Sequence, residues 1–132
     1  MDGQTDLNTL LATMHPVLHE SPYVFCSIDQ LAFRKLPFEP LATFWEEEGV
    51  TLVTTQEQAS KNSLPVHKVW ACITLTVHSS LSAVGFLASI TSALARAGIC
   101  VNPISAYYHD HLFVPWESRR QAMGAIQELS HP

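Results

Sequence analysis

The residues of this chain best suited to chemistry stand in direct succession near its C-terminal end: His109, Asp110 and His111. A carboxylate can pair with the ammonium group of a small molecule, and imidazoles titrate near neutral pH, so they can act as general acids or bases. Residues two apart in an extended chain point to the same side, which lets both histidines face one pocket. With the carboxylate or with His78 they could also bind Zn²⁺, although no spacing indicates a fourth ligand.

A second polar group lies upstream, where a β-branched strand ends in the loop His78-Ser79-Ser80 and a helix begins near Gly85. Serine hydroxyls and the free N–H groups of a helix N-terminus can hold a carboxylate through charge-assisted hydrogen bonds. Gly85 has no side chain to block the approach of a ligand to the backbone. The arrangement indicates a carboxylate site, and an ordinary capped helix behind a polar loop is the structural alternative.

Bulk composition limits the classes of function. The chain has 132 residues, of which 47% are hydrophobic and 14% charged, enough for one domain or two small subdomains with a core. Its net charge is −5 and its basic residues are scattered, which argues against nucleic-acid binding through phosphate neutralisation. The low charge content favours a surface covered by a second copy, so we expect a homodimer.

The N-terminal residues are polar and acidic, and no stretch approaches the 18 apolar residues of a membrane span, so neither a signal peptide nor a membrane association is expected. Cys26, Cys72 and Cys100 each fall in a predicted strand among apolar neighbours. They are expected to be buried, reduced thiols, since nothing nearby would lower the pKa of a catalytic thiol. These features predict a cytoplasmic protein.

The first half of the sequence predicts a helix, a strand, a connection, a strand and a short helix. Asp6 can cap the first helix, which His15-Pro16 ends. The later segments are a strand at 23–28, a connection at 29–40, an ambiguous segment at 41–48, a strand at 50–54 and a helix capped by Thr55 that runs to Asn62.

The second half predicts a β-α-β-β-α unit. Its elements are a strand at 70–77, a helix at 84–97 closed by Gly98, a strand at 99–108, a return strand at 111–114 and a helix at 117–129. Pro103 interrupts the second strand, as at an edge or a bulge. A ferredoxin-like arrangement needs a fourth strand. Either the N-terminal half or another copy of the chain must supply it.

The second half resembles an ACT domain, with Val84-Gly85-Phe86-Leu87 and Ala97-Gly98-Ile99 at the places of two family motifs. The whole chain resembles a family of stand-alone tandem ACT proteins, most specifically through the run from Tyr107 to Pro115. The resemblance implies an α/β fold of the α+β sandwich type: two ferredoxin-like, ACT-like βαββα subdomains with antiparallel sheets, at residues 1–65 and 66–132.

The resemblance extends to ACT-type amino-acid sensors, and it implies a set of ligand-binding positions in the loop, the helix start and the β-turn. These positions are His78, Ser79, Ser80, Leu81, Val84, Gly85, Phe86, His109 and Asp110. It implies a regulatory or sensing protein that binds an amino acid or a related small carboxylate, without a cofactor, and that regulates a protein partner in trans. The alternatives are a small enzyme using His109, Asp110 and His111 as acid–base or metal-binding residues, and a purely structural dimer.

Overall fold

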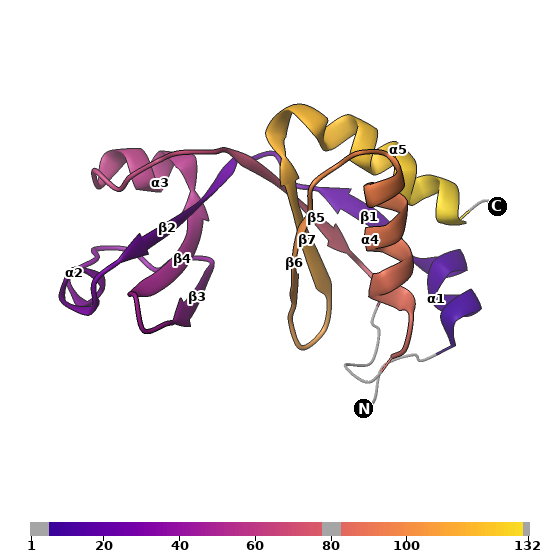
Figure 1. Ribbon diagram of the computed structural model, residues 1–132, viewed down its shortest axis with the longest axis horizontal. Coiled ribbons are helices and arrows are strands. Elements are labelled where there is room, and N and C mark those ends of the chain that lie inside the picture. The colour runs from indigo at the N-terminus through magenta and orange to yellow at the C-terminus, as the bar shows by residue number, and fades with distance from the viewer. Residues whose placement is uncertain (1–5, 78–82, 131–132) are drawn as a thin grey trace. The chain divides into compact units, whose positions relative to one another are not determined.

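A computed structural model describes residues 6–77 and 83–130 of the chain (Figure 1). The chain forms two compact units. One, here called the terminal unit, combines the chain up to Glu20 with the chain from Ala71 onward, and the other, the middle unit, is Ser21–Trp70. The division of the sequence into subdomains at residues 1–65 and 66–132 stays a prediction. In space, the N-terminal segment packs with the second half.

The middle unit has the element order β-α-β-β-α. Its elements are β2 (Tyr23–Ile28), α2 (Gln30–Arg34), β3 (Ala42–Trp45), β4 (Val50–Thr55) and α3 (Gln56–Lys61). The strands form an antiparallel sheet in the order β3-β4-β2. Its buried hydrophobic cluster is small and comprises Val24, Cys26, Leu52 and Ala59.

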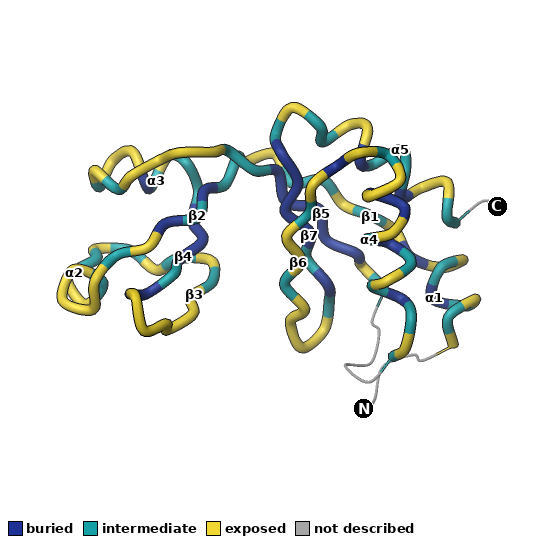
Figure 2. The backbone as a smooth tube through the Cα atoms, viewed as in Figure 1, coloured by how far each residue is buried: buried dark blue, intermediate teal, exposed yellow. Residues whose placement is uncertain are grey.

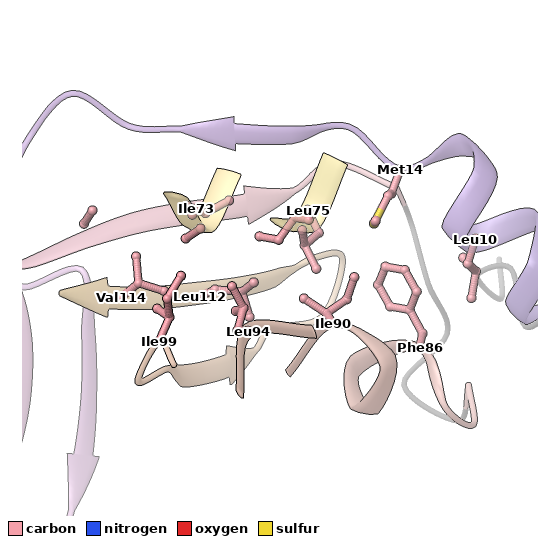
Figure 3. Packing of buried hydrophobic residues seen from close by; sticks show 13 residues of the cluster. Leu10, Met14, Ile73, Leu75, Phe86, Ile90, Leu94, Ile99, Leu112 and Val114 are labelled. Atoms are coloured by element: carbon pink, nitrogen blue, oxygen red, sulfur yellow. The ribbon is translucent and has the colours of Figure 1, made fainter. Parts of the chain in front are cut away.

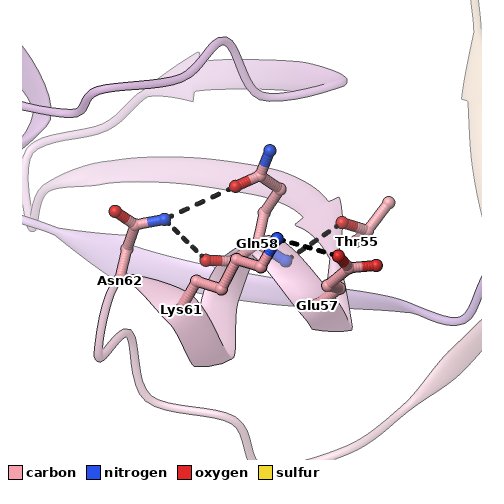
Figure 4. A network of polar contacts seen from close by, with 5 residues as sticks. All are labelled: Thr55, Glu57, Gln58, Lys61 and Asn62. Carbon is pink, nitrogen blue, oxygen red and sulfur yellow. Dashed lines mark hydrogen bonds and ion pairs between the residues drawn. The ribbon is translucent and has the colours of Figure 1, made fainter.

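Helix α3 shows how the local sequence fixes an element of the middle unit (Figure 4). The Thr55 hydroxyl accepts a hydrogen bond from the Gln58 amide at 3.2 Å, as predicted for the N-cap residue. Glu57 and Lys61, one turn apart, form an ion pair at 2.9 Å. At the other end, the Asn62 side chain donates to the Gln58 carbonyl at 2.8 Å. The expected helix from Thr55 to Asn62 is thus confirmed.

The terminal unit has the same element order, preceded by an N-terminal helix and strand. Its elements are α1 (Leu7–Thr13), β1 (Pro16–Leu18), β5 (Trp70–Leu75), α4 (Phe86–Arg96), β6 (Asn102–Ser105), β7 (Asp110–Pro115), the 3₁₀ turn η1 (Trp116–Ser118) and α5 (Arg119–Ser130). The sheet order is β1-β5-β7-β6. The ferredoxin-like α+β class predicted from the sequence is therefore confirmed.

Strand β1 is the fourth strand that the terminal unit requires. It pairs antiparallel with β5, with Val17 opposite Thr74 and Leu18 opposite Ile73. Of the two sources that the sequence allowed, the N-terminal half of the same chain supplies the strand. A second copy is therefore not needed to complete the sheet, and the expectation of a homodimer rests on the low charge content alone.

The main hydrophobic core lies between the sheet of the terminal unit and its helices. Figure 3 shows side chains of β5 and β7 facing those of α4, with Met14 and Leu10 at one end of the layer. Leu10, Ile73, Ile90, Leu94 and Leu112 have no exposed surface. Figure 2 shows that, in the terminal unit, buried residues lie along β5 and β7 and recur along the helices. This core holds α4 and β7, the two elements that carry the predicted site residues.

Several expectations about single elements are wrong. Residues 30–34 form α2 although the whole segment 29–40 was expected to be a connection, because the Asp29 carboxylate accepts from the Ala32 amide at 2.7 Å and caps the helix. Strand β1 was not expected, and the strand predicted at 99–108 is confined to Asn102–Ser105. Pro103 does lie in an edge strand, as predicted.

The cysteines divide into two classes. Cys26 and Cys72 are buried in strands, as predicted, and burial raises the pKa of each thiol, that of Cys72 to about 11. Cys100 is exposed and lies outside any strand, so the expectation that it is buried is wrong. The chain leaves α4 at Gly98 and joins β6 only at Asn102, and Cys100 lies in this connection.

Candidate functional site in the terminal unit

Helix α4 begins at a glycine in the left-handed conformation. Gly85 is the N-cap residue with φ of +88°, a conformation that costs a residue with a Cβ about 1–2 kcal/mol. As a glycine it has no side chain to accept from the N–H groups of the first turn, and that turn contains no acidic residue. This helix start therefore has a partial positive charge that its own N-cap does not satisfy.

The flanking residues of Gly85 point in different directions. Phe86 is 2% exposed and packs into the hydrophobic core, while Val84 is 86% exposed. A Cβ on Gly85 would meet Leu7 Cδ2 at 3.5 Å, an ordinary contact, so the backbone angle and not crowding favours glycine. The other predicted residues of this wall, His78, Ser79, Ser80 and Leu81, lie outside the described residues.

Asp110 is a buried carboxylate at the beginning of β7. It is 8% exposed, and its Oδ1 accepts a hydrogen bond from the Ser105 hydroxyl at 2.6 Å. Ser105 is its cross-strand partner in the register of β6 and β7. The carboxylate is thus held in place by the hairpin that carries it.

Strand geometry relates Asp110 to the start of α4. Alternation along β7 puts Asp110 on the same face as Leu112 and Val114, which belong to the core beneath the helices. In Figure 3 the labelled side chains follow one another along the layer, from Val114 and Leu112 of β7 toward Ile90 and then Phe86 of α4. Because β7 runs from Asp110 to Pro115, its beginning lies toward the N-terminal end of α4. Two predicted walls of the ligand site therefore share one face and one end of the layer.

The two histidines beside Asp110 lie toward the other face of the sheet. His111 Nδ1 forms a hydrogen bond with Thr74 Oγ1 at 2.8 Å, and the same hydroxyl oxygen bonds His19 Nε2 at 2.7 Å. The rings of His109 and His111 are 6.5 Å apart between centroids, and His109 Nδ1 is 3.4 Å from the Val77 carbonyl oxygen. Burial lowers the pKa of His111, and nearby His109 and His19 lower it further, while Asp110 raises it.

The structure therefore separates the His-Asp-His sequence into two environments. His109 and His111 come together, as the two-residue spacing predicts, while Asp110 belongs to the face covered by helices. Among the described residues, no group of three or more His, Cys, Asp or Glu side chains has the arrangement of a metal site. His109, Asp110 and His111 therefore do not face one common site as a combined acid–base group.

Sequence reasoning missed two members of the polar network. Thr74 alternates with the apolar residues of β5, which indicated a second, more polar face, but nothing local identified its partners. His19 follows a strand that was not predicted, and it meets His111 only through the tertiary fold. Recognising that β1 pairs with β5 would have brought His19 and Thr74 together.

Comparison with known proteins identifies this fold. Two family models, each described as ACT domain, match residues 2–71 and 68–128 in tandem. The chain belongs to the ACT-domain family. A search of curated proteins gave no match. Among the described residues of this ACT protein, no helix is both long enough and apolar enough to cross a membrane.

Solved structures support the same fold. A protein of unknown function from Vibrio cholerae, described as a possible transport protein, is 43% identical with a TM-score of 0.85, covering 95% of this ACT protein and 96% of that chain. Aspartate kinase of Clostridium acetobutylicum, described as an allosteric enzyme, is 9% identical with a TM-score of 0.71, covering 97% of this chain and 36% of that one. The regulatory subunit of Thermus thermophilus aspartate kinase is 11% identical with a TM-score of 0.62, covering 90% and 98%.

Proposed function

We propose that this ACT protein is a regulatory or sensing protein that binds an amino acid or a related small carboxylate in its terminal unit. The observation that carries the proposal is the start of α4 at left-handed Gly85, without a side-chain cap from that residue. The partial positive charge of such a helix start favours an anion, and the bare backbone permits close approach.

Asp110 supplies a complementary group for the ammonium end of an amino acid. Asp110 is 8% exposed and is the first residue of β7, on the face that packs against the α4 side chains. A ligand carboxylate near the helix start and a ligand ammonium near Asp110 would leave the ligand side chain toward the hairpin turn. Tyr107 and Tyr108 form this turn and are more than half exposed, with ring centroids 4.9 Å apart.

The family membership and the fold of the neighbours support a regulatory role. ACT-like folds form the regulatory subunit of one aspartate kinase and part of another that is described as allosteric. This chain corresponds to nearly the whole length of that regulatory subunit and to about a third of the kinase. By analogy of fold, regulation would act in trans on a separate protein partner. A homodimer in the cytoplasm completes the proposal.

A thermal-shift screen tests ligand binding directly. The twenty amino acids and common 2-oxo acids would each be added to the full chain, because a compound that binds the native state raises the unfolding midpoint. We expect at least one of these compounds to raise the midpoint in a concentration-dependent way, with calorimetry confirming a saturable site. Absence of any shift across the set at millimolar concentrations would contradict the proposed ligand class.

A matched pair of glycine substitutions tests the location. Gly85→Ala and Gly98→Ala both place a Cβ on a left-handed glycine, with φ of +88° and +74°, at opposite ends of α4. Each is expected to cost about 1–2 kcal/mol of stability. Only Gly85→Ala is expected to weaken binding of the compound found in the screen, by about tenfold or more. Equal affinity of the two variants would place the ligand elsewhere.

A further inference from the structure

Strand β1 is attached to the terminal unit by a short backbone pairing. It contains three residues, Pro16–Leu18, paired with Leu75, Thr74 and Ile73 of β5. Residue pairs in an antiparallel ladder alternate between hydrogen-bonded and non-hydrogen-bonded, and the bond from the His19 N–H to the Cys72 carbonyl puts Pro16 and Leu18 at non-hydrogen-bonded positions. Side-chain contacts beyond the strand must therefore contribute to holding this segment.

One further backbone hydrogen bond and a set of side-chain hydrogen bonds follow directly after β1. The backbone N–H of His19 donates to the Cys72 carbonyl at 3.0 Å, and its ring Nε2 hydrogen-bonds Thr74 Oγ1 at 2.7 Å. The same Oγ1 bonds His111 Nδ1 on β7 at 2.8 Å. One hydroxyl thus links the N-terminal segment, β5 and β7 in a chain of hydrogen bonds, here called the His19–Thr74–His111 chain.

The His19–Thr74–His111 chain requires at least one neutral imidazole ring. A hydroxyl carries one proton, so Thr74 donates to one ring nitrogen and accepts from the other, and the accepting nitrogen must be unprotonated. If His19 and His111 are both protonated, both nitrogens are donors. The hydroxyl proton must then turn away, and two positive rings flank a single oxygen atom.

The surroundings of the chain oppose this double protonation. His109, with its ring centroid 6.5 Å from that of His111, adds a third imidazole, while Asp110 is the one nearby carboxylate that favours the charged form of His111. Cys72 on β5 contributes no charge because burial raises the pKa of its thiol to about 11. Burial and neighbouring imidazoles hold the pKa of His111 below its ordinary value.

We propose that the His19–Thr74–His111 chain is a pH-sensitive clamp whose protonation, below about pH 6.5, loosens β1 from β5 and leaves the middle unit unchanged. The opened state binds more protons than the closed state between the lowered pKa of His111 and its ordinary value. The closed state is therefore destabilised relative to the opened state as the pH drops through this window.

Other anchors of the N-terminal segment do not titrate in this range and limit the opening. The backbone N–H and the hydroxyl of Thr76 both donate to the His15 carbonyl, at 3.1 and 2.7 Å. Leu10 and Met14 are 0% and 1% exposed in the core. The expected opening is local to β1 and His19, with α1 remaining packed.

Amide hydrogen exchange on the full chain tests the clamp. Rates would be measured at pH 7.5 and 5.5 and divided by the intrinsic rate at each pH. We expect the amides of Val17 and His19, which are at the hydrogen-bonded positions of the pair, to lose protection by roughly tenfold at the lower pH. Those of β4 in the middle unit, which serve as an internal standard, are expected to keep theirs.

Variants assign the effect to the two rings. His111→Asn places an amide group near the position of Nδ1, and His19→Gln places one near Nε2, so each retains hydrogen bonding without titration. Both are expected to keep protection at pH 5.5 close to that at pH 7.5. His67→Gln, at an exposed histidine of the middle unit, is the matched control and is expected to respond like the unmodified protein.

Thr74→Val removes the shared hydroxyl while nearly preserving shape. It is expected to lower the protection of β1 already at pH 7.5, and the protection of β4 will show whether the variant is folded. Equal loss of protection in β1 and β4 at pH 5.5 would overturn the proposal. So would an unchanged pH response in both histidine variants.

Discussion

Each unit contains a β-α-β-β-α set, and the helix that follows the first strand of this set begins differently in the two units. In the middle unit, β2 ends at Ile28, and Asp29 at once supplies a carboxylate that accepts from the Ala32 amide at 2.7 Å. In the terminal unit, the chain leaves β5 at Leu75 and enters α4 only after Gly85, which has no side chain to offer. In the middle unit the N-cap residue itself caps this helix, whereas in the terminal unit the N-cap residue Gly85 makes no side-chain cap.

This difference indicates which unit is suited to an external carboxylate. The N-terminus of α2 already has an acidic partner, and the helix has five residues, so little remains for a ligand. Helix α4 has eleven residues and a glycine start. The same family fold thus carries a helix start capped by its N-cap side chain in one unit and a helix start with a glycine N-cap in the other.

The cores differ in the same direction. The buried cluster of the terminal unit draws on α1, α4, α5 and two strands, β5 and β7, whereas the buried cluster of the middle unit comprises four residues from β2, β4 and α3. Left-handed Gly85, between an exposed Val84 and a buried Phe86, adopts its conformation without steric cost because it has no Cβ.

The largest expected effect tests the core that holds α4. Phe86→Ala removes a side chain that is 2% exposed and is expected to lower the free energy of unfolding by about 3–5 kcal/mol. Phe44→Ala in the middle unit, at a side chain 71% exposed, is the matched control and should change it by less than about 0.5 kcal/mol. Urea denaturation measures both. Similar losses for the two variants would contradict the described packing of α4.

The next effect tests the ammonium side of the proposed site. Asp110→Ala is expected to weaken amino-acid binding by about 1–3 kcal/mol, because it leaves a charged partner unpaired. Asp29→Ala, at the self-capped helix of the middle unit, is expected to leave the affinity unchanged. Isothermal titration calorimetry compares them. Equal affinity of Asp110→Ala and the unmodified protein would remove Asp110 from the site.

A smaller effect tests the internal cap of the middle unit. Asp29→Ala removes the acceptor of the Ala32 amide and is expected to cost about 0.5–2 kcal/mol of stability. Asp29→Asn retains an acceptor and should recover most of this loss. Chemical denaturation followed by circular dichroism provides the measurement. If both substitutions left the free energy of unfolding unchanged, the Asp29 cap would contribute nothing to stability, and the two helix starts would not differ in this respect.

The smallest expected effect concerns the exposed thiol. Cys100→Ser is expected to change stability by less than about 0.5 kcal/mol and to abolish the fast phase of alkylation by iodoacetamide at pH 8. Cys26 and Cys72 should react only slowly, because they are buried and burial raises the pKa of both thiols. Mass spectrometry counts the modified cysteines. Fast modification of Cys72 would contradict its burial in β5.

Local signals in the sequence predicted much of the fold. Alternation of β-branched residues identified β2, β4 and β5, the Thr55 cap identified α3, and Gly98 marked the end of α4. The same reasoning placed Gly85 at a helix start, but it placed Asp110 in the turn between two strands, whereas Asp110 is the first residue of β7. Helix α2 was missed because two prolines downstream obscured a cap at Asp29 that is effective in five residues.

Contacts between distant segments were beyond the reach of these signals. The sequence by itself determined that its second half lacks a fourth strand, that α4 begins at a glycine, and that a carboxylate stands between two histidines. Only the tertiary structure decided that Pro16–Leu18 fills the missing place and that the carboxylate and the histidines serve opposite faces. The physical reason is that caps and periodicity act within a few residues, whereas the His19–Thr74 hydrogen bond joins residues 55 positions apart and the β1–β5 pairing joins Pro16 to Leu75, 59 positions apart.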